Sequence, residues 1–157
     1  MGAETNVQQI SFRSAPLAPT KVTGSVQDPQ NGQQAVRSGP SKRPQLAAFP
    51  DWLVNEPNVR TTLLRGSGLT AAQAKGRAQG AAEASTDSLT ATGTLDALRY
   101  GDLLTARGIV GLRGAGTLHD GKYYVKEVTH RLRRGEYTQQ FTLTREGLGS
   151  TVLTVTP

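Results

Sequence analysis

Cysteine is absent from this chain of 157 residues, which excludes a disulfide framework and every thiolate metal site. Aromatic residues make up only 5% of the sequence and apolar residues 36%, so we expect the ordered core to cover only part of the chain. No apolar run is long enough to span a bilayer, and no secretory leader is evident at the start. The lack of cysteine fits a cytosolic origin.

The residue patterns of common catalytic and metal sites are missing as well. The sequence contains no G-x-S-x-G, G-K-[ST] or G-x-G-x-x-G motif and no paired carboxylates of the glycosidase kind. His119 and His130 lie eleven residues apart, with Asp120 beside the first, but no third ligand has a suitable spacing. His130 is more simply a polar strand residue, hydrogen-bonded to a neighbour. We therefore expect no enzymatic activity, no cofactor and no metal.

The strongest pattern that is present lies in the last third of the chain. Residues 122–132 and 137–145 are rich in tyrosine, valine, threonine, phenylalanine and leucine, which suits a half-buried sheet. The second run alternates apolar and polar side chains with the period of a strand. Arg134-Gly135 predicts a two-residue turn between the runs, because Gly135 can adopt the positive φ that such a turn requires.

This turn fixes the register of the predicted hairpin. It sets Leu132 opposite Tyr137 and Val128 opposite Phe141. Continuing the same register would place Lys126 against an apolar partner, so we infer a β-bulge near 126–127 that brings Val125 into that place.

Further strands and a helix are predicted upstream. Residues 88–95 form a threonine-rich strand candidate, and short apolar runs between 103 and 112 are interrupted by glycines. Residues 70–84 are rich in alanine, and Thr70 with Gln73 forms a capping-box pattern. The alanines at helical spacing predict a face that packs on the barrel of the same chain, with an intersubunit contact as the alternative. Four or five short antiparallel strands predict a small barrel or sandwich.

The chain divides into two regions by composition. Residues 1–45 are polar and rich in turn-forming residues, so we expect an extended arm, or the remnant of a preceding domain, with one strand around 21–26. Residues 46–157 form the predicted β-barrel domain with its helix at 70–84. Trp52 is expected to anchor its segment on this barrel, and a binding aromatic is the less favoured alternative.

Charge gives one functional hint. The formal net charge is +6, and Arg131, Arg133 and Arg134 gather at the expected hairpin tip. Other basic residues flank the tip and carboxylates interleave on an expected solvated face; these residues are Lys122, Lys126 and Arg145, and Glu127, Glu136 and Glu146. The tip could be a solvated turn that protects a strand edge, a charged interface to an acidic protein partner, or a non-specific nucleic-acid site. The three tip arginines are our candidate protein-interface residues.

Three segments in this region together resemble one family. They read R-x-x-V-G-x-R-G-A-G at 107–116, D-G-x-Y-Y-V-x-x-V-T-H at 120–130 and R-G-x-Y-x-Q-x-F-T-L-x-R-E-G at 134–147. The combination is similar to the C-terminal region of the phage late-control protein D family. These are baseplate hub proteins of contractile phage tails and of phage-tail-like contractile injection systems. The resemblance covers residues 87–157 well and extends loosely to 49–60.

The resemblance implies a structural role. The expected fold is mainly β with one α-helix, a small antiparallel tail-tube-like or hub-like β-barrel preceded by an extended N-terminal arm. The implied protein is a homotrimeric ring component that joins inner-tube proteins to a central spike protein, with no small-molecule substrate and no membrane span. It would be assembled in the bacterial cytoplasm within a phage-tail-like particle, with or without later release from the cell. The alternative function is a small basic β-barrel that binds nucleic acid.

Overall fold

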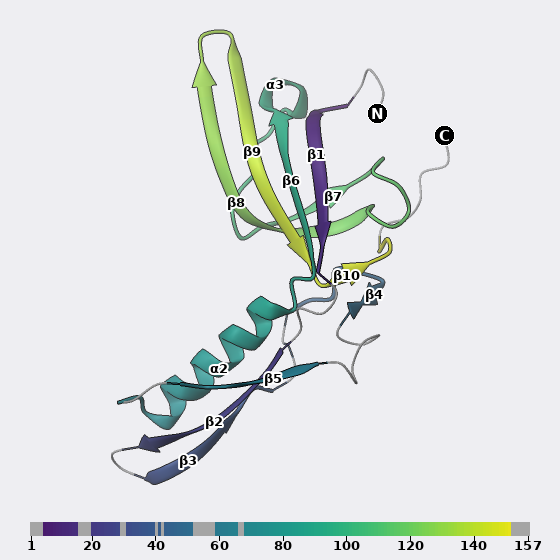
Figure 1. Cartoon of the computed structure of the whole chain (residues 1–157). Helices are drawn as coiled ribbons and strands as arrows, with labels where there is room; N and C mark the ends of the chain where they lie inside the picture. The colour runs from purple at the N-terminus through teal and green to yellow at the C-terminus, as the bar shows by residue number, and fades with distance from the viewer. Residues whose placement is uncertain are drawn as a thin grey trace.

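The computed structural model describes residues 5–15, 20–28, 31–39, 41, 43–51, 59–65 and 68–151. The chain forms an elongated molecule with two parts (Figure 1). One part is a five-stranded antiparallel sheet with the strand order β1-β6-β9-β8-β7. The other combines a helix with a three-stranded sheet of order β3-β2-β5. Trp52 lies outside the described residues, so its expected anchoring role stays a prediction.

The strands and helices follow the chain in this order: β1 Val7–Ser14, β2 Thr20–Asp28, β3 Gly32–Arg37, β4 Phe49–Pro50, β5 Arg60–Leu63, α2 Ala71–Ser85, β6 Leu89–Asp96, α3 Ala97–Tyr100, β7 Ile109–Leu112, β8 Gly121–Arg133, β9 Glu136–Arg145 and β10 Gly147–Leu148. The fold is therefore mainly β with one main helix, as the sequence predicts. β4 and β10 pair with each other between the two parts (Figure 1). No helix in the described part of the chain is both long and apolar enough to cross a membrane.

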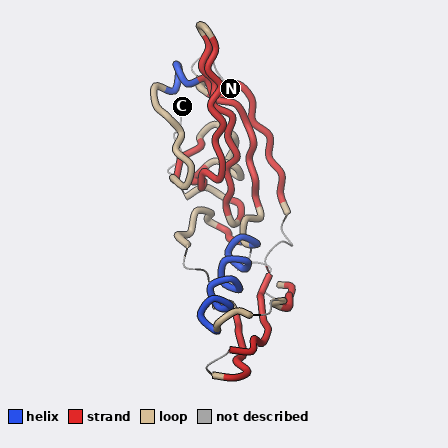
Figure 2. The backbone as a smooth tube through the Cα atoms, turned by 90° about the vertical axis from the view of Figure 1, so that its left-hand side faces the viewer, coloured by secondary structure: helices blue, strands red, loops and turns tan. Residues whose placement is uncertain are grey.

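The five-stranded sheet curls into a half-barrel. Its long strands run along one end of the molecule, while α2 lies at the other end (Figure 2). β1 and β7 are the two edges of the sheet. The antiparallel, barrel-like fold predicted from the sequence is confirmed, in the form of a sheet that stays open between these edges.

The register of the β8–β9 hairpin matches the prediction. Leu132 lies opposite Tyr137, Val128 opposite Phe141, and the register shifts between Val125 and Glu127. The predicted bulge is thus present. The turn residue Gly135 has a φ of 79°, the left-handed conformation that this turn needs.

The half-barrel has its own apolar core. Its buried members come from four segments: Leu89, Ala91, Leu95, Leu104, Tyr123, Val125, Phe141 and Leu143. Gly93 in β6 allows its neighbours to approach closely. A Cβ at Gly93 would lie 2.6 Å from Cζ of Phe141 and would also clash with the carbonyl oxygen of Gln9 in β1. Glycine at this position therefore lets β1 and the Phe141 ring close over β6.

Helix α2 begins as predicted, with Thr70 as N-cap and a reciprocal capping box with Gln73. Its alanine face is buried at Ala74, Ala78 and Ala82. The partner of that face differs from our expectation. The alanines pack against valines of β2 and β3, namely Val22, Val26 and Val36, and not on the barrel sheet. The small side chains bring the helix close to this separate three-stranded sheet.

The N-terminal region also differs from the expected extended arm. The strand expected around 21–26 is present as β2, which pairs antiparallel with β3 and parallel with β5. β1, however, pairs with β6 along its length and forms an edge of the half-barrel. Val7, Ile10 and Phe12 pack against the core cluster there. The polar residues between them gave this segment the composition of an arm, so the expectation was wrong for β1. A domain boundary at residue 45 stays a prediction.

Candidate functional site

The β8–β9 hairpin carries the three arginines predicted as an interface. Residues Glu136 and Tyr137 of β9 pair only with β8, because pairing of β9 with β6 starts at Thr138. The tip consequently extends beyond the neighbouring strand, as Figure 1 shows. In the described part of the chain, β8 beyond Val125 has β9 as its one strand partner.

The tip is basic and exposed. Arg131, Arg133 and Arg134 are all exposed, and none has an ion pair or side-chain hydrogen bond within the described residues. Leu132 lies between them with 72% of its surface exposed. The structure thus brings the three candidate residues together around an apolar side chain. This combination of cations and exposed leucine is suited to protein contact.

The two histidines lie in different environments. Nδ1 of His130 is 2.8 Å from the hydroxyl of Tyr137, so the hydrogen bond expected for His130 is present. The His119 ring stacks on Phe12, with ring centroids 4.2 Å apart. Within the described ranges, no group of three histidine, aspartate or glutamate side chains could hold a metal ion.

Arg145, at the end of β9, is a buried cation. Its side chain donates hydrogen bonds to backbone carbonyls of Leu118 at 2.5 Å, Asp120 at 3.0 Å and Gly149 at 3.3 Å. The guanidinium also lies over the Tyr123 ring. Arg145 therefore holds the loop between β7 and β8 and the residues after β10 against the sheet. Its planar array of donors suits several carbonyls at once.

Burial shifts the ionisation of this pair. The pKa of Tyr123 is raised from 10.0 to about 12, chiefly by burial, while the positive charge of Arg145 opposes the shift. Burial likewise lowers the pKa of Arg145, and Tyr123 and the nearby carboxylates oppose that shift. The Tyr123 hydroxyl donates a hydrogen bond to the carbonyl oxygen of His119 at 2.6 Å. Both side chains therefore hold the same loop.

Glu146 follows directly and holds another segment. Its Oε1 accepts hydrogen bonds from the backbone amides of Leu46 and, at 3.0 Å, Ala47. Gly147 then pairs with Pro50 through β10 and β4. Consecutive residues of the R-E-G motif thus contact two distant parts of the chain. This arrangement provides structural cross-links.

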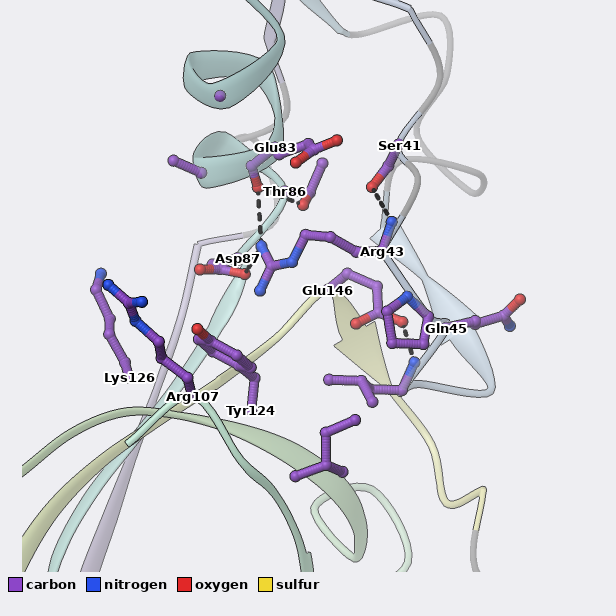
Figure 3. A pocket seen from close by; sticks show the side chains of 15 residues that line it. Ser41, Arg43, Gln45, Glu83, Thr86, Asp87, Arg107, Tyr124, Lys126 and Glu146 are labelled. Atoms are coloured by element: carbon purple, nitrogen blue, oxygen red, sulfur yellow. Dashed lines mark hydrogen bonds and ion pairs between the residues drawn. The ribbon is translucent and has the colours of Figure 1, made fainter. Parts of the chain in front are cut away.

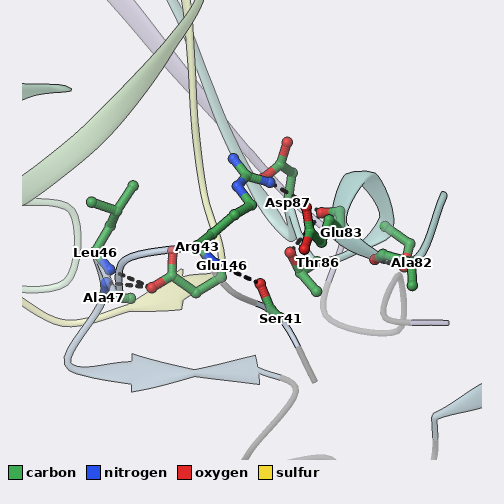
Figure 4. A network of polar contacts seen from close by, with 10 residues as sticks. Ser41, Arg43, Leu46, Ala47, Ala82, Glu83, Thr86, Asp87 and Glu146 are labelled. Atoms are coloured by element: carbon green, nitrogen blue, oxygen red, sulfur yellow. Dashed lines mark hydrogen bonds and ion pairs between the residues drawn. The ribbon is translucent and has the colours of Figure 1, made fainter. Parts of the chain in front are cut away.

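A second polar network lies where α2 meets the sheet (Figure 4). Nη1 of Arg43 is 2.8 Å from Oδ1 of Asp87 and donates to the carbonyl oxygen of Glu83 at 3.0 Å. Its guanidinium carbon is 5.2 Å from the ring centroid of Tyr124. Arg43 thereby connects the segment before β4, the end of α2 and strand β8.

Two expectations about charged residues were wrong. Arg145 was expected on the flank of a basic patch and Glu146 on a solvated face, but they are 0% and 9% exposed. Glu127 and Glu136 are exposed as expected. Sequence reasoning missed the two buried residues because their partners lie far away in the sequence. The available signal was their position directly after an alternating strand, where β9 reads as buried on both faces in its last turns.

Comparisons with known proteins bear on the fold. No protein-family model matches the sequence, and no curated protein matches it. The chain is similar to the 43 kDa tail protein of prophage MuSo2 from Shewanella oneidensis, with a TM-score of 0.54, 13% identity, and coverage of 94% of this chain and 42% of that chain. It is also similar to a tail protein from Neisseria meningitidis MC58, with a TM-score of 0.52, 12% identity, and coverage of 95% and 43%. The chain therefore shares its fold with two tail proteins and spans less than half the length of each.

Proposed function

We propose that this chain is a structural component of a phage tail or phage-tail-like particle, and more specifically part of its baseplate hub. The observation that carries the proposal is the fold, which nearly the whole chain shares with two tail proteins. The three sequence segments at 107–147 support the same family of assemblies. The role is mechanical: a β-sheet ring joins the inner tube to the central spike and bears load between them.

The open half-barrel is suited to assembly with other chains. β1 is an edge strand of eight residues without proline or lysine, the residues that commonly protect edges. β7 forms the opposite edge. Pairing of such edges with neighbouring chains would close the sheets into a ring. We propose three copies of the hub in that ring.

The length of the chain bears on this assembly. Because it spans less than half of either tail protein, the remaining hub domains would come from other polypeptide segments. Ring formation would then depend on those segments. The exposed tip at Arg131, Arg133 and Arg134 would meet an acidic surface of the tube or the spike, since complementary charge sets the register between proteins.

Co-purification tests the proposal. The chain is co-expressed with the tube and spike proteins encoded beside it, with a tag on the spike alone. We expect the chain to elute with the spike, and substitution of the three tip arginines by alanine to weaken that association. Failure of the wild-type chain to associate with either partner would overturn the hub role.

The same variant separates the alternative function. If the chain instead retains duplex or single-stranded DNA in a salt-dependent way, and the three alanine substitutions remove that retention, nucleic-acid binding replaces the hub assignment.

A further inference from the structure

A pocket of about 630 Å³ lies at the junction between α2 and the half-barrel. Four segments line it: residues 41–46, the last turn of α2 with the residues that follow it, the turn before β7, and the outward side of β8. Figure 3 shows Arg107, Lys126 and Tyr124 on one side of the pocket and the Arg43–Asp87 pair above them. The lining is mixed, because Leu46 and the half-exposed Ile109 add apolar surface.

The carboxylates around this pocket already have partners. Asp87 forms its ion pair with Arg43 at 2.8 Å. Glu146 accepts from two backbone amides and is almost completely buried. Glu83 accepts a hydrogen bond from Nε2 of Gln79 at 2.7 Å. None of the three contacts a cation on the β8 side of the pocket through a hydrogen bond or ion pair within the described residues.

The cations on the β8 side are unpaired. Arg107 and Lys126 line the pocket, and neither side chain has a hydrogen bond or ion pair with any residue that the structure describes. Tyr124 lies beside them, and its ring is the one on which Arg43 stacks. The junction therefore presents two positive charges and an aromatic surface toward the same space.

The backbone holds Arg107 in a conformation that favours glycine. Its φ is 70°, and it is the one described residue other than glycine with a positive φ. The turn is fixed on both sides of Arg107: its own amide donates to the carbonyl oxygen of Val125 at 2.8 Å, and the amide of Val125 donates to that of Gly108 at 2.9 Å. A strained backbone that carries a specific side chain into a pocket points to a role for that side chain.

We infer that this pocket binds an acidic, partly apolar peptide segment of a partner protein. Carboxylates of the segment pair with Arg107 and Lys126, while an apolar side chain of the segment packs on Ile109 and Tyr124. The mixed lining and the volume exceed what a single small anion would use. Arginine and a carboxylate form paired hydrogen bonds, which gives Arg107 the larger share of recognition. The inference extends the proposed function by giving the chemistry of one partner, but it stands on the pocket alone.

Fluorescence anisotropy with a defined probe tests the inference. The probe is a short fluorescein-labelled peptide in which glutamate alternates with leucine and serine, and the comparison peptide carries glutamine in place of glutamate. We expect the glutamate peptide to bind and the glutamine peptide to bind about tenfold more weakly or worse, because the charge-assisted pairs are lost.

Two variants locate the binding. Arg107→Gly should lower affinity for the glutamate peptide by about tenfold while the fold is kept, because glycine adopts the turn conformation without strain. Lys126→Gln should lower affinity by about threefold, whereas the matched Lys75→Gln on the exposed side of α2 should leave it unchanged. Thermal melting of each variant verifies that it is folded.

Three results would overturn the inference. These are equal binding of the two peptides, an equal loss for Lys126→Gln and Lys75→Gln, and unchanged affinity in folded Arg107→Gly. Binding of a single-stranded oligonucleotide or of inorganic phosphate that competes fully with the peptide would replace the acidic segment by a phosphate ligand. The outcome is distinguishable from failure of the hub role, because that role is read from co-purification with the spike.

Discussion

The guanidinium of Arg145 lies over the ring of Tyr123, with 4.5 Å between the guanidinium carbon and the ring centroid, and both side chains have no exposed surface. The two residues sit opposite the same loop and both bond to its backbone carbonyls. A cation on an aromatic face gains more when it is desolvated. The end of the half-barrel therefore depends on one cation that is held by carbonyls and a ring.

Replacing Arg145 tests this dependence. Arg145→Lys keeps the charge but cannot reach three carbonyls with a planar set of donors, so it should lower the free energy of unfolding by about 2–4 kcal/mol. The control is Arg131→Lys at the exposed tip, which should change stability by less than about 0.5 kcal/mol. Urea unfolding followed by circular dichroism measures both. Equal stability of the two variants would contradict the role given to Arg145.

The ionisation of Tyr123 predicts a dependence on alkaline pH. Its pKa is about 12 in the folded protein against an ordinary value of 10.0, so the folded state holds its proton more tightly than the unfolded state. The contribution to stability is complete below pH 10 and is lost as the pH rises to 12. Tyr123→Phe removes this contribution together with the hydrogen bond to His119, at a cost of about 1 kcal/mol at neutral pH.

The measurement is the free energy of unfolding between pH 9 and pH 12 for wild type and Tyr123→Phe, which brackets the two pKa values in question. The wild type should lose more stability over this interval than the variant. Parallel curves would mean that the Tyr123 phenol is not shielded by the sheet.

Gly93 should not accept a side chain. In Gly93→Ala the added methyl group would meet the Phe141 ring and the backbone of β1, so it should destabilise the protein by about 1–3 kcal/mol. Gly111→Ala is the matched control in the edge strand β7, where an added Cβ has no atom within 4 Å. It should change stability by less than about 0.5 kcal/mol. Thermal unfolding of the pair decides the matter, and a control that is the more damaging of the two would refute the packing of β1 on β6.

Glu146 should be needed to hold the segment before β4. Glu146→Ala leaves two buried backbone amides without their acceptor, which should cost about 2–3 kcal/mol. Glu136→Ala removes an exposed carboxylate of the same hairpin and serves as control. Amide hydrogen exchange should show faster exchange at Leu46 and Ala47 in the first variant alone. Unchanged protection at both amides would contradict this contact.

The parts of the fold that the sequence predicts are those set by near neighbours. The β8–β9 register follows from the turn at Gly135 and from side-chain alternation, and the bulge follows because Lys126 would otherwise enter the core. The capping box of α2 is likewise local. The roles of Arg145 and Glu146 depend on loops that only tertiary structure brings near. β1 was missed for the same reason, since its few apolar residues acquire meaning only beside β6.

The central claim is that this chain forms part of a hub ring in a tail-like particle. Native mass spectrometry of the chain purified together with its spike partner and the remaining hub segments tests this claim most directly. The account predicts a complex with three copies of the chain. A chain that stays monomeric at high concentration, and still does so with those partners present, would contradict it.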